Sequence, residues 1–152
     1  MPQIFVDADG CPVKQDVFRV AKRYDLQVTL VANAGMSIPP GDRVELIVVS
    51  AGFDAADDYI ASHVARNDIV ITDDIPLAAR CLEQNAHVLS TRGKRFTDES
   101  IGEALATREL MTDLRAMGTV GGGPAPFDQR DRSNFLQRLD QMIHAARKAM
   151  GP

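Results

Sequence analysis

Strand-like apolar runs alternate with helix-like stretches through the first 90 residues, and this alternation constrains the fold most strongly. The helix-like stretches place apolar residues three or four apart, as Val13, Val17 and Val20 do. Strands that alternate with helices over short connections are typical of βαβ units. The sequence therefore predicts an α/β fold with a mainly parallel, doubly wound sheet and right-handed crossovers. The expected strands are 3–7, 26–33, 43–50, 68–72 and 86–90, and the expected helices between them are 11–24, 53–66 and 75–85.

The last third of the chain follows a different pattern. Residues 100–118 and 133–150 are predicted to form two further helices, and a glycine- and proline-rich loop with the run GGGP at 121–124 separates them. A connection of this length is often functional or disordered. We interpret residues 1–152 as one domain, in which residues 100–152 form a C-terminal two-helix extension.

Several protein classes are excluded by composition. No run approaches the roughly 20 apolar residues that span a bilayer, and the N-terminus does not resemble a signal peptide, so we expect a cytoplasmic protein without membrane contact. The two cysteines and three histidines lack the spacing of zinc ligands. No feature of the sequence specifies an oligomeric state.

Charge is distributed unevenly along the chain. Residues 1–75 carry 12 acids and 6 bases (net −6), and residues 76–152 carry 9 acids and 11 bases (net +2), which gives the overall −4. This balance is not the basic footprint of a typical nucleic-acid-binding protein. It fits either an acidic cluster faced by a mildly basic second half or an ordinary solvated surface.

Acidic residues gather where the predicted strands end. Asp7 ends the first strand, and Asp73 and Asp74 follow the fourth. In an open parallel sheet, ligands bind outside the carboxyl ends of the strands. Three further acids begin the helix after the third strand, on the same side of the sheet if the topology is correct. The candidate acids are Asp7, Asp9, Asp54, Asp57, Asp58, Asp73 and Asp74.

A divalent cation would explain such a cluster. Neighbouring carboxylates raise one another's pKa and resist ionisation, so gathering them without a cation is costly. Carboxylate oxygens suit Mg²⁺ or Mn²⁺, and Mg²⁺ usually keeps several waters beside one or two protein carboxylates. A metal so held can lower the pKa of bound water and neutralise charge on a phosphodiester. We therefore expect Mg²⁺ or Mn²⁺ as the cofactor.

Each acid also has a purely structural interpretation. Asp74 precedes Ile75-Pro76 and is well placed as a helix N-cap, and Asp54 is a second candidate cap. Asp57 and Asp58 suit the dipole of a first helical turn. One carboxylate has two oxygens, so Asp74 can cap a helix and bind a metal at once. Asp73 is expected to be its solvent-facing neighbour, and Asp7 with Asp9 could form an Asx-type turn.

Six motifs together resemble the YaiI/YqxD family, also called UPF0178, of small bacterial proteins. The resemblance covers nearly the whole chain, with the motifs in the same order. The family is similar to PIN-like domains, a group rich in Mg²⁺- or Mn²⁺-dependent ribonucleases, so the resemblance implies a PIN-like fold and RNA as a possible partner. The motifs are DADGCPV (7–13), GFDAADDYI (52–60), ITDDIPLAAR (71–80), TRGKRF (91–96), GGP (122–124) and DRSNF (131–135).

The resemblance also implies roles for individual residues. It implies catalytic roles for Asp7, Asp58, Asp74 and Asp9, and metal ligation by Asp7, Asp58, Asp74 and Asp57, of which Asp57 and Asp58 are alternatives for the mid-chain acid. Thr72 would orient Asp74 through its hydroxyl. Asp98 lies near a further acid of many PIN domains. The C-terminal extension with its GGP motif departs from an ordinary PIN domain.

Basic residues follow the fifth predicted strand and begin the last helix. Arg92, Lys94, Arg130 and Arg132 could contact the phosphates of a nucleic-acid strand. They could equally be solvated loop charges. The resemblance and the acid cluster together favour RNA as the partner.

Three functional hypotheses remain open from the sequence. The first is a metal-dependent nuclease acting on RNA. The second is a phosphatase of the haloacid dehalogenase type, because FVDADG resembles the first motif of that group. Asp7 would be the nucleophile, Asp9 the acid/base and Lys94 the basic residue. Cys11, however, stands where that motif has Thr or Val. The third is a non-catalytic nucleic-acid- or protein-binding module with a vestigial site.

Overall fold

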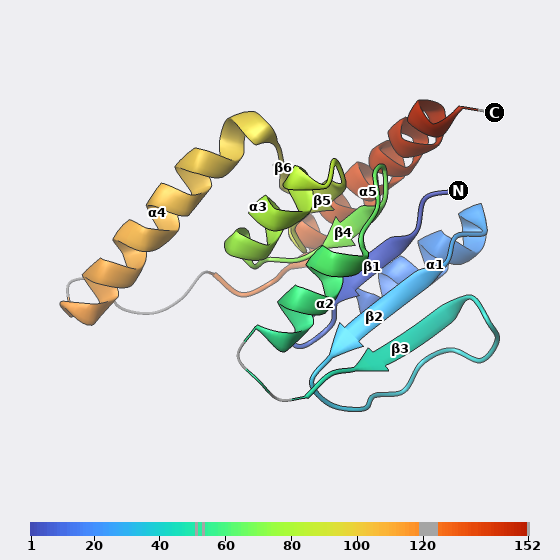
Figure 1. Ribbon diagram of the computed structural model, residues 1–152, viewed down its shortest axis with the longest axis horizontal. Helices are drawn as coiled ribbons and strands as arrows, with labels where there is room; N and C mark the ends of the chain where they lie inside the picture. Colours follow the sequence, from blue (N-terminus) through green and yellow to red (C-terminus); the bar gives the residue numbers. More distant parts are fainter. Residues whose placement is uncertain (51, 53, 119–124, 152) are drawn as a thin grey trace.

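A six-stranded, mostly parallel sheet forms the centre of the molecule (Figure 1). The computed structural model describes residues 1–50, 52, 54–118 and 125–151. Within them the strand order is β3-β2-β1-β4-β5-β6; only the β5–β6 pair is antiparallel. This confirms the predicted α/β fold, which is consistent with a PIN-like arrangement. The strands are β1 (Ile4–Asp7), β2 (Val28–Ala32), β3 (Val44–Val48), β4 (Ile69–Ile71), β5 (His87–Leu89) and β6 (Arg95–Phe96).

Helices cover both faces of the sheet. The helices are α1 (Lys14–Tyr24), α2 (Ala55–His63), α3 (Ile75–Glu83), α4 (Asp98–Ala116) and α5 (Gln129–Met150). Because side chains alternate along a strand, Ile4 and Val6 of β1 join one core cluster while Phe5 joins the other. The first cluster includes residues of α1 and α5, and the second includes residues of α2 and α3. The central strands are therefore apolar on both sides.

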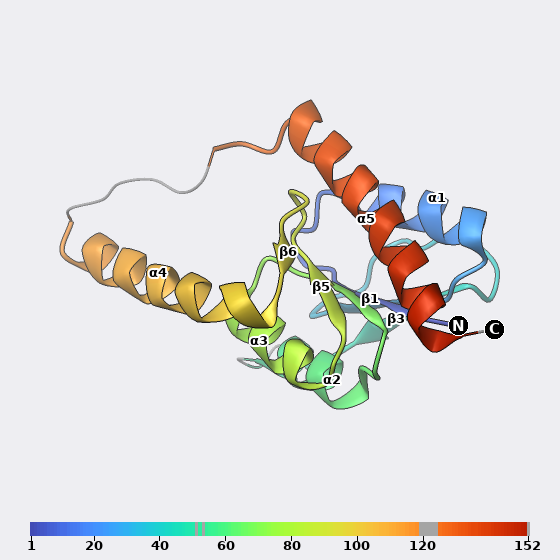
Figure 2. The same cartoon turned by 90° about the horizontal axis from the view of Figure 1, so that it is seen from above.

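The two C-terminal helices play different parts. Helix α5 buries Phe135, Leu139 and Ile143 against the sheet and thus completes the face that it shares with α1. Helix α4 contacts α3 at its first turns and then extends away from the body (Figures 1 and 2). Of its residues only Ala104 is buried. The N-terminal end of the chain lies beside the end of α5 (Figures 1 and 2).

Element boundaries differ from the predictions where local hydrogen bonds extend a helix. Helix α4 begins at Asp98, because Thr97 and Ser100 form a reciprocal capping box. Helix α5 begins at Gln129 rather than 133, because Asp128 and Asp131 form another. Strand β6 was not predicted. The GGGP run at 121–124 lies outside the described residues. Within the described ranges, no helix combines the length and the apolar character needed to cross a bilayer.

Candidate acidic site at the carboxyl edge of the sheet

The predicted acids meet at the carboxyl edge of the central strands. Val6 of β1 pairs with Ile71 of β4, so Asp7 and Thr72, the residues that follow, lie next to each other. A shallow cavity of about 230 Å³ opens at this edge. Among the described residues, its lining contains five carboxylates and no basic side chain. The lining residues are Asp7, Asp9, Asn33, Gly52, Asp54, Ala55, Ala56, Asp57 and Asp74.

Thr72 joins the two central acids. Its hydroxyl donates a hydrogen bond to Asp7 Oδ2 (2.9 Å) and accepts one from the backbone N–H of Asp74 (3.0 Å). The predicted hydroxyl contact between Thr72 and Asp74 is therefore present, but it involves the backbone of Asp74, and the hydroxyl donates its hydrogen bond to the Asp7 carboxylate. Thr72 is 1% exposed, so this arrangement is shielded from water.

Asp74 is the N-cap of α3, as predicted. Its Oδ1 accepts a hydrogen bond from the backbone N–H of Leu77 (2.9 Å), and Pro76 stands in the first turn. Only one carboxylate oxygen is used by the cap, so the other can face the cavity. The cap thus holds Asp74 at this edge and leaves one of its carboxylate oxygens available for a ligand.

Asp9 is held by a different partner from the one predicted. Its Oδ2 accepts a hydrogen bond from the backbone N–H of Asn33, directly after β2 (2.9 Å). The expected Asx-type turn with Asp7 is replaced by this link between the ends of β1 and β2. Asn33 and Asp9 therefore form the β2 side of the cavity.

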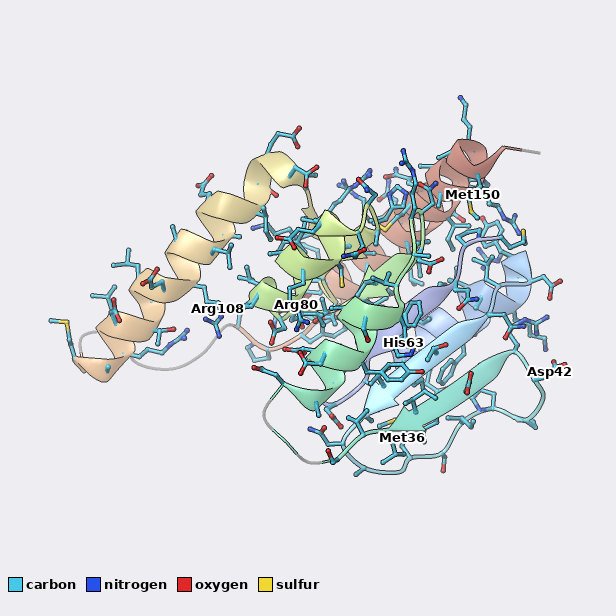
Figure 3. All side chains as sticks on the ribbon, viewed as in Figure 1. Met36, Asp42, His63, Arg80, Arg108 and Met150 are labelled. Carbon is cyan, nitrogen blue, oxygen red and sulfur yellow. The ribbon has the colours of Figure 1, made fainter. Side chains whose placement is uncertain are left out.

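Helix α2 presents Asp57, rather than Asp58, to the cavity. Asp58 is exposed and forms an ion pair with Arg80 of α3 (2.8 Å), which Figure 3 labels. Asp57 is half-buried and lines the cavity. A signal in the sequence distinguishes the two, because Asp57 lies three residues before Ile60 and seven before Val64, on the buried stripe of the helix.

Asp54 occupies the N-cap position of α2 but makes no capping hydrogen bond with its side chain. The predicted capping role is therefore wrong. Its backbone is left-handed (φ 67°), and the side chain lines the cavity instead. The sequence analysis included Asp54 in the acidic cluster without assigning it a role in the site, and it did not include Asn33.

Like-charge repulsion and burial perturb two of the carboxylates. Burial raises the pKa of Asp7, the Thr72 hydrogen bond lowers it, and the charges of Asp74, Asp9 and Asp73 raise it further. The pKa of Asp57 is raised to about 6, first by burial and then by Asp74, Asp7 and Asp54, against a lowering effect of Arg80. The cavity thus concentrates negative charge that its own lining leaves uncompensated.

The donor set fits a hard divalent cation held largely through water. All the side chains offered are oxygen donors, as Mg²⁺ and Mn²⁺ prefer. Among the described residues, however, no three His, Cys, Asp or Glu side chains converge closely enough to hold an ion together. The predicted direct set of Asp7, Asp58 and Asp74 is not assembled, since Asp58 points to Arg80. One or two of Asp7, Asp57 and Asp74 with several waters would match the usual Mg²⁺ mode.

Comparison with known proteins identifies the relatives of this chain. Residues 5–145 match the model of the family described as "Uncharacterized BCR, YaiI/YqxD family". The chain belongs to the YaiI/YqxD family. A UPF0178 protein of Rhodospirillum centenum is 56% identical over 97% of this chain and 99% of its own length. Similar UPF0178 proteins of Paramagnetospirillum magneticum (52% identity; 99% of each chain) and Rhodospirillum rubrum (51%; 96% and 98%) also match. No solved structure matches.

In this YaiI/YqxD protein, Asp73 links the acidic edge to β5. It is solvent-exposed, as expected, but its carboxylate also accepts hydrogen bonds from the backbone N–H (2.8 Å) and the hydroxyl (2.7 Å) of Thr91. The end of β4 is thereby tied to the turn that follows β5. These hydrogen bonds hold Thr91 in place, and therefore also position Arg92, the basic residue that follows it.

The four basic residues predicted to contact phosphate lie in different surroundings. Arg132 forms an ion pair with Asp16 of α1, and the Asp16 side chain is completely buried. This ion pair joins α5 to α1. Arg130 is exposed in the first turn of α5. Arg92 pairs with Asp131 (3.2 Å) and donates to the Ala125 carbonyl. Arg92 and Lys94 line a second cavity, whose lining includes none of the candidate acids.

Proposed function

We propose that this YaiI/YqxD protein is a divalent-metal-dependent phosphodiesterase that cleaves RNA at the carboxyl edge of its sheet. The observation that carries the proposal is the cavity in which Asp7, Asp9, Asp54, Asp57 and Asp74 meet without a basic side chain in the lining. Such a cluster is unfavourable by itself and becomes favourable with a bound cation. The implied similarity of the family to PIN-like ribonucleases points to the same chemistry.

Of these acids, Asp7 and Asp74 would hold Mg²⁺ or Mn²⁺ together with several waters. When bound, the cation would neutralise charge on the phosphodiester and lower the pKa of a water molecule. Thr72 orients Asp7 by donating to its Oδ2, and the helix cap orients Asp74. Asn33 holds Asp9 at the rim of the cavity.

Asp57 is suited to accept a proton. Burial and the neighbouring carboxylates raise the pKa of Asp57 to about 6 in the absence of metal, and a general base is most effective when its pKa lies near the working pH. Asp58, which the resemblance also implies, is occupied by Arg80. We therefore assign the mid-chain acid of this site to Asp57.

The phosphatase alternative is supported less well. It requires a basic residue beside Asp7, and Lys94 was the candidate. Lys94 lines a cavity with Arg92 and α5 residues, whereas Asp7 lines the acidic cavity. The nuclease proposal uses the residues that the acidic cavity contains.

Thermal melting in EDTA, Mg²⁺ and Mn²⁺ tests the metal site. We expect metal to raise the melting temperature of the wild type, because a ligand present at 100 times its dissociation constant stabilises the fold by about 2.7 kcal/mol. Asp74→Asn should lose this rise, since asparagine keeps the helix cap but removes the charge. Asp58→Asn is the matched control, because Asp58 lies outside the cavity, and it should keep the rise.

Cleavage of a labelled single-stranded RNA tests the activity. Wild type and Asp58→Asn should cleave it in Mg²⁺ or Mn²⁺, and Asp7→Asn and Asp74→Asn should not. Activity that survives Asp7→Asn would contradict the proposal. If the melting temperature is the same in EDTA and in metal, and no RNA is cleaved, the binding-module hypothesis would be favoured.

A further inference from the structure

A second cavity, of about 350 Å³, lies between the turn after β5 and helix α5. Apart from Gly93, every residue in its lining is either positively charged or a neutral amide. This contrasts with the acidic cavity and with the net charge of −4 on the whole chain. The lining residues are Arg92, Gly93, Lys94, Asn134, Gln137, Arg138 and Gln141.

Helix α5 contributes one continuous polar stripe to this cavity. Asn134, Gln137, Arg138 and Gln141 stand at intervals of three and four residues, so they share one face of the helix. The adjacent stripe, which includes Phe135 and neighbours one and two turns on, is buried in the core. The core packing of α5 therefore sets which side chains face the cavity.

The two walls of the cavity are fixed relative to each other. Gly93 has a φ of +88°, and a Cβ built on it would lie 2.6 Å from the backbone carbon of Asn134. The turn and the helix thus pack backbone against backbone. The Lys94 N–H also donates to Ser90 Oγ (2.9 Å), and Arg92 is held by Asp131. A cavity with rigid walls loses little entropy when it binds a ligand.

The donors of this cavity suit a phosphate oxyanion. Lys and Arg side chains offer donors and a full positive charge, and the amide N–H groups add neutral donors. Lys94 and Arg138 are both exposed, and within the described part of the chain neither forms an ion pair. As far as the structure describes the chain, the lining contains no carboxylate that would repel an anion.

The position of the cavity connects it to the acidic edge. Thr91, whose backbone and hydroxyl hold the Asp73 carboxylate, immediately precedes Arg92. Strands β4 and β5 are paired neighbours, and neighbouring strands lie about 4.8 Å apart. Asp73 immediately precedes Asp74 of the acidic cavity, so the contact between Asp73 and Thr91 joins the two linings, and a polymer bound at one cavity can extend to the other. This link between the two cavities is of use only to a ligand long enough to occupy both, which favours a polymer over a small free anion.

We propose that the cavity between the 91–94 turn and α5 binds a backbone phosphate of the RNA strand that crosses the acidic edge. This inference rests on the proposed function for its substrate class. It adds Asn134, Gln137, Arg138 and Gln141 to the residues that hold the strand. Because these side chains contact phosphate, they position the RNA and carry no sequence preference.

Fluorescence anisotropy with a labelled single-stranded RNA, in EDTA to prevent cleavage, tests the cavity. The double variant Lys94→Ala/Arg138→Ala should weaken binding by about tenfold or more, equally for RNAs of different sequence. The slope of log affinity against log salt should fall by about 0.7, since the cavity neutralises one phosphate and each phosphate contact on a single strand contributes about 0.7. Inorganic phosphate should compete with the RNA in the wild type.

A matched control separates the cavity from net charge. Arg108→Ala/Lys148→Ala removes one arginine and one lysine from exposed positions on α4 and the end of α5, and Arg108 is labelled in Figure 3. This variant should bind RNA like the wild type. Equal losses in both double variants would overturn the proposal, as would unchanged binding by the cavity variant. Binding of inorganic phosphate or a mononucleotide without any RNA binding would also overturn it.

Binding and cleavage distinguish this inference from the proposed function. If RNA binding depends on Lys94 and Arg138 but no metal leads to cleavage, the phosphate cavity would be supported and the nuclease proposal contradicted. RNA that is cleaved in an Asp74-dependent reaction, with binding unaffected by the cavity variant, would overturn the phosphate cavity and support the nuclease.

Discussion

The hydroxyl of Thr72 donates to Asp7 Oδ2 at 2.9 Å, across 65 residues of sequence. The Thr72 hydroxyl oxygen also accepts a hydrogen bond from the backbone N–H of Asp74. One buried threonine therefore joins the ends of β1 and β4 and sets the spacing of two acids that would otherwise repel each other. The acidic edge depends on this residue for its geometry.

Replacement of Thr72 by valine should destabilise the protein. Valine keeps the shape but leaves the Asp74 N–H and the Asp7 carboxylate without their partner, so we expect the free energy of unfolding to fall by about 1–3 kcal/mol. Urea denaturation measures the change. Thr112→Val is the control, because its hydroxyl bonds only the Arg108 carbonyl on an exposed helix surface, and it should change stability by less than about 0.5 kcal/mol. Equal effects would contradict the role of Thr72.

Asp57 should make the protein less stable as pH rises. Its pKa is about 6 when folded and about 3.9 in an unfolded chain, so between these values the folded state binds more protons. Stability then falls from about pH 4 to pH 6 and stays lower above. Because Asp57 is only half-buried, solvent screening reduces the effect to about 1 kcal/mol.

Urea denaturation in EDTA from pH 4.5 to 8 measures this dependence. The stability difference between Asp57→Asn and the wild type should grow with pH in favour of the variant. Asp113→Asn, which removes an exposed acid of α4, is the control and should show no such growth. A difference that does not depend on pH would show that Asp57 titrates as in the unfolded chain.

Gly93→Ala should be strongly destabilising. The added Cβ would meet the backbone of Asn134 and Phe135 at 2.6–2.8 Å, and the φ of +88° disfavours any other residue. We expect a loss of about 2 kcal/mol or more in chemical denaturation. Gly102→Ala is the contrast, because it lies in α4 with open space around it and should stabilise by about 0.5–1 kcal/mol. A neutral Gly93→Ala would mean that the turn and α5 can separate easily.

Arg132→Gln should cost stability where Arg130→Gln does not. Asp16 is completely buried and pairs with both Arg19 and Arg132. Removal of one partner from a buried charge is costly, and with Arg19 still present we expect a loss of about 2 kcal/mol. Arg130 is exposed, so its substitution should change stability by less than about 0.5 kcal/mol. Thermal melting of both variants compares the two roles. Equal melting temperatures would mean that the Arg132–Asp16 ion pair contributes no more to stability than an exposed arginine does.

Sequence periodicity was sufficient to predict most of the fold, because each buried strand and helix carries its own apolar pattern. The Asp74 cap was predictable for a similar reason, since an acid followed by Ile75-Pro76 is a local signal. Strand β6 is only two residues long, too short for any periodicity to reveal. The first turns of α4 and α5 depend on capping boxes that the apolar pattern does not include.

The site was harder to predict than the fold, because its details depend on long-range pairing. The contacts of Asp73 with Thr91 and of Asp16 with Arg132 join residues 18 and 116 positions apart. Neither follows from local sequence, because they require the register of β5 and the packing of α5. The choice between Asp57 and Asp58 was accessible, since the buried stripe of α2 fixes the rotation of the helix.

The central place of β1 has a consequence for biosynthesis. The first strand to leave the ribosome pairs with β4, where Ile4 lies opposite Ile69, and one of its faces is covered by α5 as far as Ala146. Contacts between such distant residues slow folding, because a long loop must close before they form. A nascent chain therefore carries an incomplete core until α5 has emerged, and we expect its apolar first strand to need protection from aggregation until then.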